Sequence, residues 1–242
     1  MGVGAEHHDG AVPRQGTRTS EAGGGQGAVS RDASPSAPEF VAQFGEDRIL
    51  WDLLGPKNDG FFLDIGAYDG VLGSNTYFFE QVGWSGICIE PNPWKYVECT
   101  NARPRSRVVH AALSRRHHVG VRPFTIVTEP TGSEALSFLT TSPLHLRRCQ
   151  IESQRMVQVP VPVLSADIVL GDHAGPIDFV SLDVEGAELD VLAGFDLNRF
   201  RPRAFVIEDN TFGRDWRTED YMARYGYRRT HATGCNFIYM LG

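Results

Sequence analysis

The chain has 242 residues, of which 41% are hydrophobic and 22% are charged, which is enough for one domain with a substantial core. Its formal net charge of −7 argues against a general nucleic-acid-binding protein, which would carry a basic surface. The four cysteines form no C-x-x-C pair, and neither a signal-peptide pattern nor an apolar run near the ~20 residues of a membrane span is present, so we expect a reduced, cytoplasmic protein without membrane partners.

The first part of the chain differs in composition from the rest. Residues 1–38 are rich in Gly, Ser, Ala and Pro and contain no aromatic residue. Such a segment cannot bury enough apolar surface to offset the entropy that is lost on ordering. We therefore predict a disordered tail over residues 1–38 and one folded domain over residues 39–242. In that domain, residues 43–54 carry apolar side chains at helical spacing and predict the first helix.

An apolar strand that runs into a glycine turn is the most informative segment. The run Phe62-Leu63-Asp64-Ile65 predicts a strand with an acidic residue at its end, and a turn with two glycines follows. Residues 74–80 open with cap-type residues and predict a helix, so that the backbone can approach a ligand closely, with N–H groups aimed at it. A second strand, residues 86–90, ends on Glu90, about 20–25 residues further on, where a nucleotide-binding βαβ unit places the acid that holds ribose hydroxyls. The pattern predicts a nucleoside-containing cofactor.

The glycine spacing indicates which cofactor this is. The turn Gly66-Ala67-Tyr68-Asp69-Gly70 lacks the middle glycine of the dinucleotide fingerprint G-x-G-x-x-G, which lets a pyrophosphate lie against the backbone. Asp64 and Asp69 would repel a pyrophosphate, whereas they suit a ligand with a cationic amino group. No G-x-x-x-x-G-K-[ST] phosphate loop is present in the sequence. S-adenosylmethionine therefore fits better than NAD or a nucleoside triphosphate.

Beyond Glu90 the strands and helices continue to alternate, apart from one insertion. Residues 119–163 contain two predicted strands, 121–127 and 156–163, and the prolines at 160 and 162 indicate an edge strand. We expect this insertion to shape the substrate site, although a plain structural hairpin would give the same pattern. The other predicted elements are helices at 94–102, 165–170, 185–192 and 215–225, a short strand and loop at 107–114, strands at 177–182 and 204–207, and a hairpin at 227–240.

Several ordered motifs resemble the FkbM family of S-adenosylmethionine-dependent methyltransferases. They are the runs at residues 60–70, 74–77, 83–93 and 177–188, and the similarity extends over about residues 43–210. The alternation of strands and helices predicts an α/β fold with a mostly parallel sheet covered on both faces. The resemblance implies a Rossmann-like class I methyltransferase fold, with a seven-stranded sheet and an antiparallel C-terminal hairpin. It also implies methylation of a hydroxyl oxygen on a small-molecule acceptor such as a sugar.

The resemblance assigns the cofactor-binding residues. It implies that Asp64 orients the glycine turn and faces the methionine part of the cofactor, and that Glu90 accepts hydrogen bonds from both ribose hydroxyls. The start of the next helix, at residues 74 and 75, is expected to bind the methionine carboxylate, and residues 110–112 to flank the adenine. The full predicted set is Asp64, Gly66, Ala67, Tyr68, Asp69, Ser74, Asn75, Glu90, Pro91 and Ala112.

A second group of acids follows two later strands. Asp183 comes at the carboxyl end of one predicted strand, and Glu208 and Asp209 come at the end of the next, so their side chains should converge at one edge of the sheet. Oxygen ligands of this kind suit Mg²⁺. A resemblance to metal-dependent sugar methyltransferases supports these three acids as metal ligands. Alternatively, they bind substrate hydroxyls or cap the loops that follow.

The general base and the role of the arginine clusters remain open at this point. Asp183 or Glu185 could accept the proton of the acceptor hydroxyl, since no motif singles out a histidine. Arginines at 103, 105 and 107 are expected on a solvated face near loops, with an anionic ligand as the alternative. An NAD-type oxidoreductase and a non-catalytic scaffold with the same fold are the competing interpretations of the whole chain.

Overall fold

The computed structural model describes residues 37–129, 133–139, 143–152 and 155–242. The predicted disordered tail lies outside the described residues, apart from residues 37 and 38. Residues from Ala37 to Gly242 form one compact unit. None of the helices in the described ranges is both long enough and apolar enough to cross a membrane.

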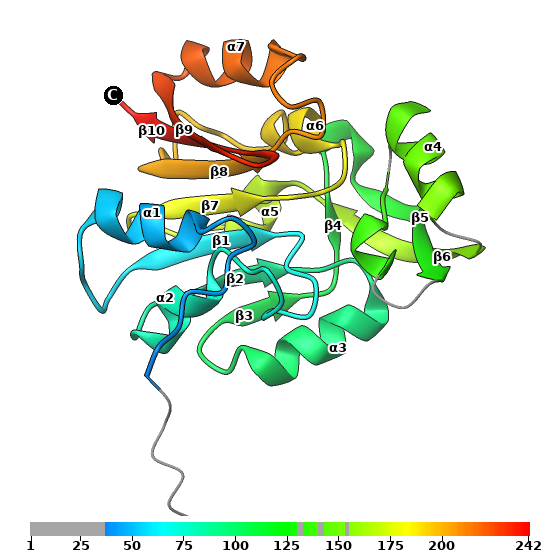
Figure 1. The fold of residues 1–242 in the computed structure, drawn as a ribbon, viewed down its shortest axis with the longest axis horizontal. Coiled ribbons are helices and arrows are strands. Elements are labelled where there is room, and N and C mark those ends of the chain that lie inside the picture. Colours follow the sequence, from blue (N-terminus) through cyan, green and yellow to red (C-terminus); the bar gives the residue numbers. More distant parts are fainter. Residues whose placement is uncertain (1–36, 130–132, 140–142, 153–154) are drawn as a thin grey trace, which may run out of the picture. The chain divides into compact units, whose positions relative to one another are not determined.

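A seven-stranded sheet forms the centre of this unit, as predicted. Five neighbouring strands are parallel, and the last two form a hairpin that is antiparallel to its neighbour (Figure 1). The inner strands are apolar along their whole length because both of their faces are covered. In spatial order the strands are β3 (Arg107–Val109), β2 (Ser85–Ile89), β1 (Phe61–Ile65), β7 (Phe179–Leu182), β8 (Ala204–Glu208), β10 (Asn236–Leu241) and β9 (Tyr227–Thr233).

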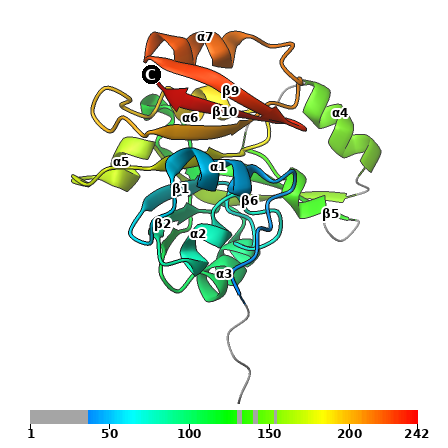
Figure 2. The same ribbon diagram turned by 60° about the vertical axis from the view of Figure 1, so that its left-hand side comes forward.

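Helices cover both faces of the sheet (Figures 1 and 2). Neighbouring residues of β1 point to opposite faces: Phe62 packs with the first three helices, and Leu63 packs with the last three. The predicted cap of the helix at 165–170 is confirmed, since the Ser165 hydroxyl accepts a hydrogen bond from the Ile168 N–H. The helices are α1 (Glu46–Leu54), α2 (Tyr77–Gln81) and α3 (Pro93–Ala102) on one face, and α5 (Ala166–Leu170), α6 (Glu188–Leu192) and α7 (Arg217–Arg224) on the other.

The insertion forms a second, smaller sheet at the right of Figure 1. Both predicted strands are present, as β5 (Gly120–Glu129) and β6 (Arg155–Leu164), and helix α4 (Pro143–Glu152) was not predicted. The edge position predicted for β6 is wrong, because β6 lies between β5 and the short strand β4 (Ala112–Leu113). However, β4 pairs only with the last two residues of β6, so both prolines lie where β6 has β5 as its only neighbour.

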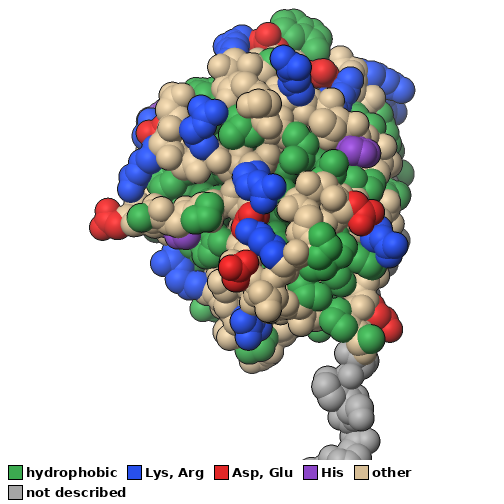
Figure 3. Space-filling model, turned by 90° about the vertical axis from the view of Figure 1, so that its left-hand side faces the viewer, with side chains coloured by type: hydrophobic (Ala, Val, Ile, Leu, Met, Phe, Trp, Pro, Cys, Tyr) green, Lys and Arg blue, Asp and Glu red, His purple; other side chains and the backbone are tan. Residues whose placement is uncertain are grey.

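Charged side chains of both signs are interspersed on the face that is the left side of Figure 1 (Figure 3). The site residues predicted from the sequence lie instead where the parallel strands end. Because β1 lies between β2 and β7, the carboxyl ends of these three strands meet at one edge of the sheet. That edge is where open α/β sheets bind their ligands.

Candidate functional site

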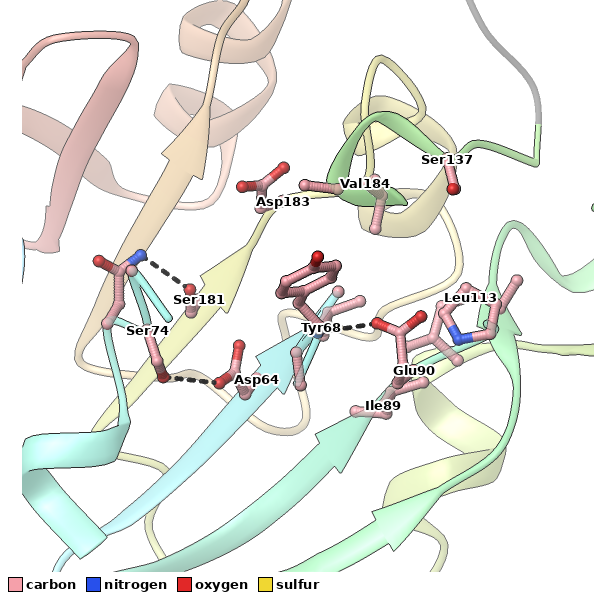
Figure 4. A pocket seen from close by; sticks show the side chains of 18 of the residues that line it. Asp64, Tyr68, Ser74, Ile89, Glu90, Leu113, Ser137, Ser181, Asp183 and Val184 are labelled. Atoms are coloured by element: carbon pink, nitrogen blue, oxygen red, sulfur yellow. Dashed lines mark hydrogen bonds between the residues drawn. The ribbon is translucent and has the colours of Figure 1, made fainter. Parts of the chain in front are cut away.

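A cavity of about 530 Å³ opens at the carboxyl ends of β1, β2 and β7 (Figure 4). Asp69 is the predicted cofactor residue that does not line it. Its carboxylate instead accepts hydrogen bonds from the N–H groups of Val71 and Leu72, both at 2.8 Å, and so caps the turn. The other predicted residues do line it: Asp64, Gly66, Ala67, Tyr68, Ser74, Asn75, Glu90, Pro91 and Ala112.

The glycine turn serves close packing of the backbone. Gly66 has φ +90°, and a Cβ at this position would lie 1.7 Å from the carbonyl oxygen of Asp183. The N–H groups of Gly66 and Ala67 both donate to the carbonyl oxygen of Ile89, at 3.0 and 3.1 Å. These two amides therefore donate within the protein. The glycine allows the ends of β1 and β7 to approach each other.

Glu90 is held by two backbone hydrogen bonds at the end of β2. Its Oε2 accepts from the Tyr68 N–H at 2.8 Å, and its Oε1 accepts from the Asn92 N–H at 2.7 Å (Figure 4). Each carboxylate oxygen can accept further hydrogen bonds, so two ribose hydroxyls can still be bound. Burial raises the pKa of Glu90 to about 8.

Asp64 and Asn75 form the opposite end of the cavity. The Asp64 Oδ2 accepts from the Thr76 hydroxyl at 2.5 Å and from the Ser74 hydroxyl at 3.5 Å. The Asn75 amide nitrogen donates to the Ser181 hydroxyl at 3.0 Å, whereas its buried Oδ1 has no hydrogen-bond partner among the described residues. A carboxylate and a free amide oxygen are acceptors, so this end suits an ammonium group better than the carboxylate that we predicted for residues 74 and 75.

One wall of the cavity is apolar. Ala111, Ala112 and Leu113 line it together with Ile89 and Phe124, as a flat heteroaromatic ring requires. Of residues 110–112, which we predicted to flank the adenine, Ala111 and Ala112 line the cavity and His110 does not. His110 turns away, with its Nε2 3.0 Å from the carbonyl oxygen of Pro91 and its ring stacked on Tyr96.

Asp183 belongs to a cluster of three carboxyl groups. This cluster contains Glu185 in place of Asp209, which we predicted. Ligand atoms of Asp183, Glu185 and Glu208 all lie within 4.8 Å of one another. Asp209 is not among them: its carboxylate accepts from the N–H and hydroxyl groups of Thr211, at 2.8 and 2.5 Å, and from the Gly213 N–H at 2.9 Å. Successive side chains at a strand end point to opposite sides, so Glu208 and Asp209 cannot both face the cluster.

The cluster is electrostatically crowded. Asp183 is exposed to the cavity but surrounded by protein, and burial, followed by repulsion from Glu185, raises its pKa to about 7. Burial and the nearby Asp183 raise the pKa of Glu208 well above its ordinary value. The Asn210 amide donates to Glu185 at 3.0 Å and to Glu208 at 2.8 Å, which fixes both carboxyl groups.

A histidine that sequence reasoning missed completes the cluster. The Nδ1 of His145, in α4, lies 3.1 Å from the Oε2 of Glu185, and its Nε2 lies 3.0 Å from the carbonyl oxygen of Leu136. Burial lowers the pKa of His145, but the Glu185 carboxylate outweighs burial and leaves this pKa above its ordinary value. No local motif marks His145, because its contact with Glu185 is made between the insertion and the loop after β7.

A second cavity of about 1010 Å³ lies on the other side of Asp183. Asp183, Gln43 and Ala135 line both cavities. The walls of the second cavity include the acidic cluster, His145 and two partly exposed phenylalanines, Phe44 and Phe212. A group held in the first cavity can therefore meet one held in the second at Asp183.

Comparisons with known proteins give a family match and several similar structures. The model of the methyltransferase FkbM domain matches residues 64–229. No curated protein matches the chain. Similar solved structures include a TehB-like S-adenosylmethionine-dependent methyltransferase from Corynebacterium glutamicum, with 14% identity, coverage of 83% of this chain and 89% of that chain, and a TM-score of 0.42. An O-methyltransferase from Bacillus cereus in complex with S-adenosylhomocysteine has 12% identity, coverage of 85% and 84%, and a TM-score of 0.42.

Proposed function

Because the chain belongs to the FkbM methyltransferase domain family, we propose that it transfers the methyl group of S-adenosylmethionine to a hydroxyl oxygen of a small metabolite such as a sugar. The meeting of two cavities at Asp183 carries this proposal. One cavity matches the cofactor in chemistry and the other is large enough for an acceptor. A carboxyl group stands at the boundary, where the acceptor hydroxyl must lose its proton.

In our proposal the cofactor occupies the first cavity, and the chemistry of the lining residues supports this. Its ribose hydroxyls donate to Glu90, its ammonium group donates to Asp64 and to the Oδ1 of Asn75, and its adenine lies against the apolar wall around Ala112. This orientation uses the unpartnered acceptor atom of Asn75. It also leaves the sulfonium and its methyl group in the middle of the cavity, on the side of Asp183.

Methyl transfer requires alignment of the acceptor oxygen, the methyl carbon and the sulfur, together with removal of one proton. In our proposal Asp183 accepts that proton as the hydroxyl oxygen bonds to the methyl carbon and the carbon–sulfur bond breaks, which leaves S-adenosylhomocysteine. A pKa of about 7 suits this task near neutral pH. Glu185 is engaged by His145 and Asn210, so it orients the acceptor or Asp183.

We also propose that the carboxyl groups of this cluster bind Mg²⁺. The donor atoms are oxygens, which Mg²⁺ prefers, and those of the three residues lie within 4.8 Å of one another. Asp183, Glu185 and Glu208 would hold the ion, in place of the predicted set that included Asp209. A bound Mg²⁺ lowers the pKa of a hydroxyl group that it contacts.

The Asp183→Asn variant tests the proposal. We expect S-adenosylhomocysteine release, measured over a panel of sugars and other hydroxyl-bearing metabolites, to fall by about 10²–10⁴-fold. Affinity for S-adenosylhomocysteine, measured by calorimetry, should stay unchanged. Asp69→Asn makes the same chemical change outside both cavities and should retain activity. Loss of cofactor affinity in Asp183→Asn, or release that no hydroxyl compound stimulates, would contradict the proposal.

Chelation distinguishes a cluster that binds Mg²⁺ from one in which Asp183 acts as the base without a metal. Exhaustive treatment with EDTA, followed by readdition of Mg²⁺, should abolish and then restore turnover if the ion is required. Full turnover after chelation would remove the metal and leave Asp183 as the base by itself.

A further inference from the structure

A buried arginine lies beneath the cofactor cavity, and no step described so far uses it. Arg103, at the end of α3, is 1% exposed. It donates from Nε to Glu80 at 2.8 Å, from Nη1 to the carbonyl oxygen of Gly70 at 2.8 Å, and from Nη2 to the Thr76 hydroxyl at 2.7 Å. The expectation of a solvated arginine face is therefore wrong for this residue. A charge buried this completely needs a specific set of partners.

The contacts of Arg103 span the loop that closes one end of the cavity. Gly70 and Thr76 bracket the segment that carries Ser74 and Asn75, both of which line the cavity. A guanidinium has no acceptor, so the Thr76 oxygen must accept from Arg103, and its single proton is left for Asp64. The distance from this hydroxyl to the Asp64 Oδ2 is 2.5 Å. A second path from Arg103 to Asp64 runs through the Ser74 hydroxyl, which lies 3.3 Å from Nη1 of Arg103 and 3.5 Å from Oδ2 of Asp64, so the shorter contacts are those through Thr76.

We propose that Arg103 is a positioning residue which, through the Thr76 hydroxyl, holds the Asp64 carboxylate in place for the ammonium group of the cofactor. Neither Arg103 nor Thr76 lines the cavity, so both act through Asp64. The proposal rests on the cofactor of the proposed function and not on its acceptor. It assigns specificity for the amino-acid end of the ligand to residues that never touch it.

Electrostatics support this role. Asp64 is 4% exposed, and burial raises its pKa while the positive charge of Arg103 opposes the rise. A protonated Asp64 would lose its attraction for an ammonium group. On its other side, Arg103 is held by Glu80, whose carboxylate also accepts from the Ser106 hydroxyl and the Arg105 N–H. The planar guanidinium is therefore fixed in orientation, which a lysine cannot reproduce.

Two ligands separate a positioning role from a merely structural one. S-adenosylhomocysteine carries the amino-acid end, whereas 5′-methylthioadenosine has the same adenine and ribose without it. In Thr76→Val, which keeps the shape but removes the hydroxyl, we expect affinity for S-adenosylhomocysteine to fall about tenfold by calorimetry, with affinity for methylthioadenosine unchanged. Thr76→Ser restores the hydroxyl and should recover the affinity. The Arg103→Lys variant, provided that it folds, should also lose affinity for S-adenosylhomocysteine and keep its affinity for methylthioadenosine.

Glu90→Ala is the matched control, because it removes a contact that both ligands make. It should weaken both of them. An equal loss for both ligands in Thr76→Val, or no loss for either, would overturn the positioning role and leave the proposed methyltransferase function intact. If the wild-type protein bound neither ligand, the cofactor assignment would fail and the positioning role would fail with it.

Discussion

Asp64, Glu90 and Asp183 all line the first cavity, and their different surroundings support the different role that we propose for each. Glu90 is held by two backbone N–H groups, Asp64 by two hydroxyls above a buried arginine, and Asp183 faces two other acids. Desolvation raises the pKa of all three carboxyl groups. What distinguishes them is the partner that remains available to each: a pair of hydroxyls for Glu90, a cation for Asp64, and a proton for Asp183.

Glu90 makes the stability of the ligand-free protein depend on pH. Its pKa is about 8 in the folded protein and near 4.5 in the unfolded chain, so the native state keeps a proton that the unfolded state has lost. The free energy of unfolding should therefore decrease from about pH 5 to about pH 8 and then level off as far as this group is concerned. Glu90→Gln should reduce that slope in urea denaturation, whereas Asp52→Asn, at an exposed carboxyl, should not. An identical slope in Glu90→Gln and wild type would refute the assignment.

At the scale of elements, helix α4 connects the insertion to the acidic cluster. It brings His145 to Glu185 across a buried contact of 3.1 Å, while β5 and β6 form the sheet behind it. The first cavity does not include His145, and the second does. Helix α4 should therefore act on the acceptor and not on the cofactor, although other residues of the insertion, such as Phe124, line the first cavity.

The His145→Leu variant tests this division between the cavities. Turnover should fall about 10–100-fold, the usual cost of losing a residue that orients a catalytic or ligating group, with unchanged affinity for S-adenosylhomocysteine. His145→Asn can place an amide N–H near the position of Nδ1 and should recover part of the turnover. Leu146→Ala changes the next residue of α4, which lines neither cavity, and serves as the control. Weakened cofactor binding in His145→Leu would show that helix α4 also supports the first cavity.

At the scale of the whole molecule, the first described residues are anchored to the rest of the folded domain. Phe40 stacks on Phe78 with 4.0 Å between the ring centroids, and the N–H groups of Val41 and Ala42 donate to Asp47 at 2.7 and 3.0 Å. Deleting residues 1–36 should leave the melting temperature and the affinity for S-adenosylhomocysteine unchanged, because that segment lacks apolar anchors. Deleting residues 1–42 removes these contacts and part of the first cavity, so it should lower both. A large loss from the shorter deletion would move the domain boundary toward the N-terminus.

Local patterns in the sequence determined the fold and most of the first cavity. Apolar runs set the strands of the sheet, and one strand, one glycine turn and the acid at Glu90 lie within a single βαβ unit, whose geometry is local. The family resemblance, confirmed by the match over residues 64–229, rests on the same segments.

Only the tertiary structure decided which polar groups act together. Asp69 and Asp209 lie beside the predicted sites in sequence but cap turns, because the direction of a side chain depends on backbone dihedrals that spacing does not reveal. Arg103 and His145 reach their sites through contacts between distant segments, and no local signal distinguishes them from the other arginines and histidines. Side-chain convergence depends on how separate elements pack, so it could not be read from the sequence of any one element.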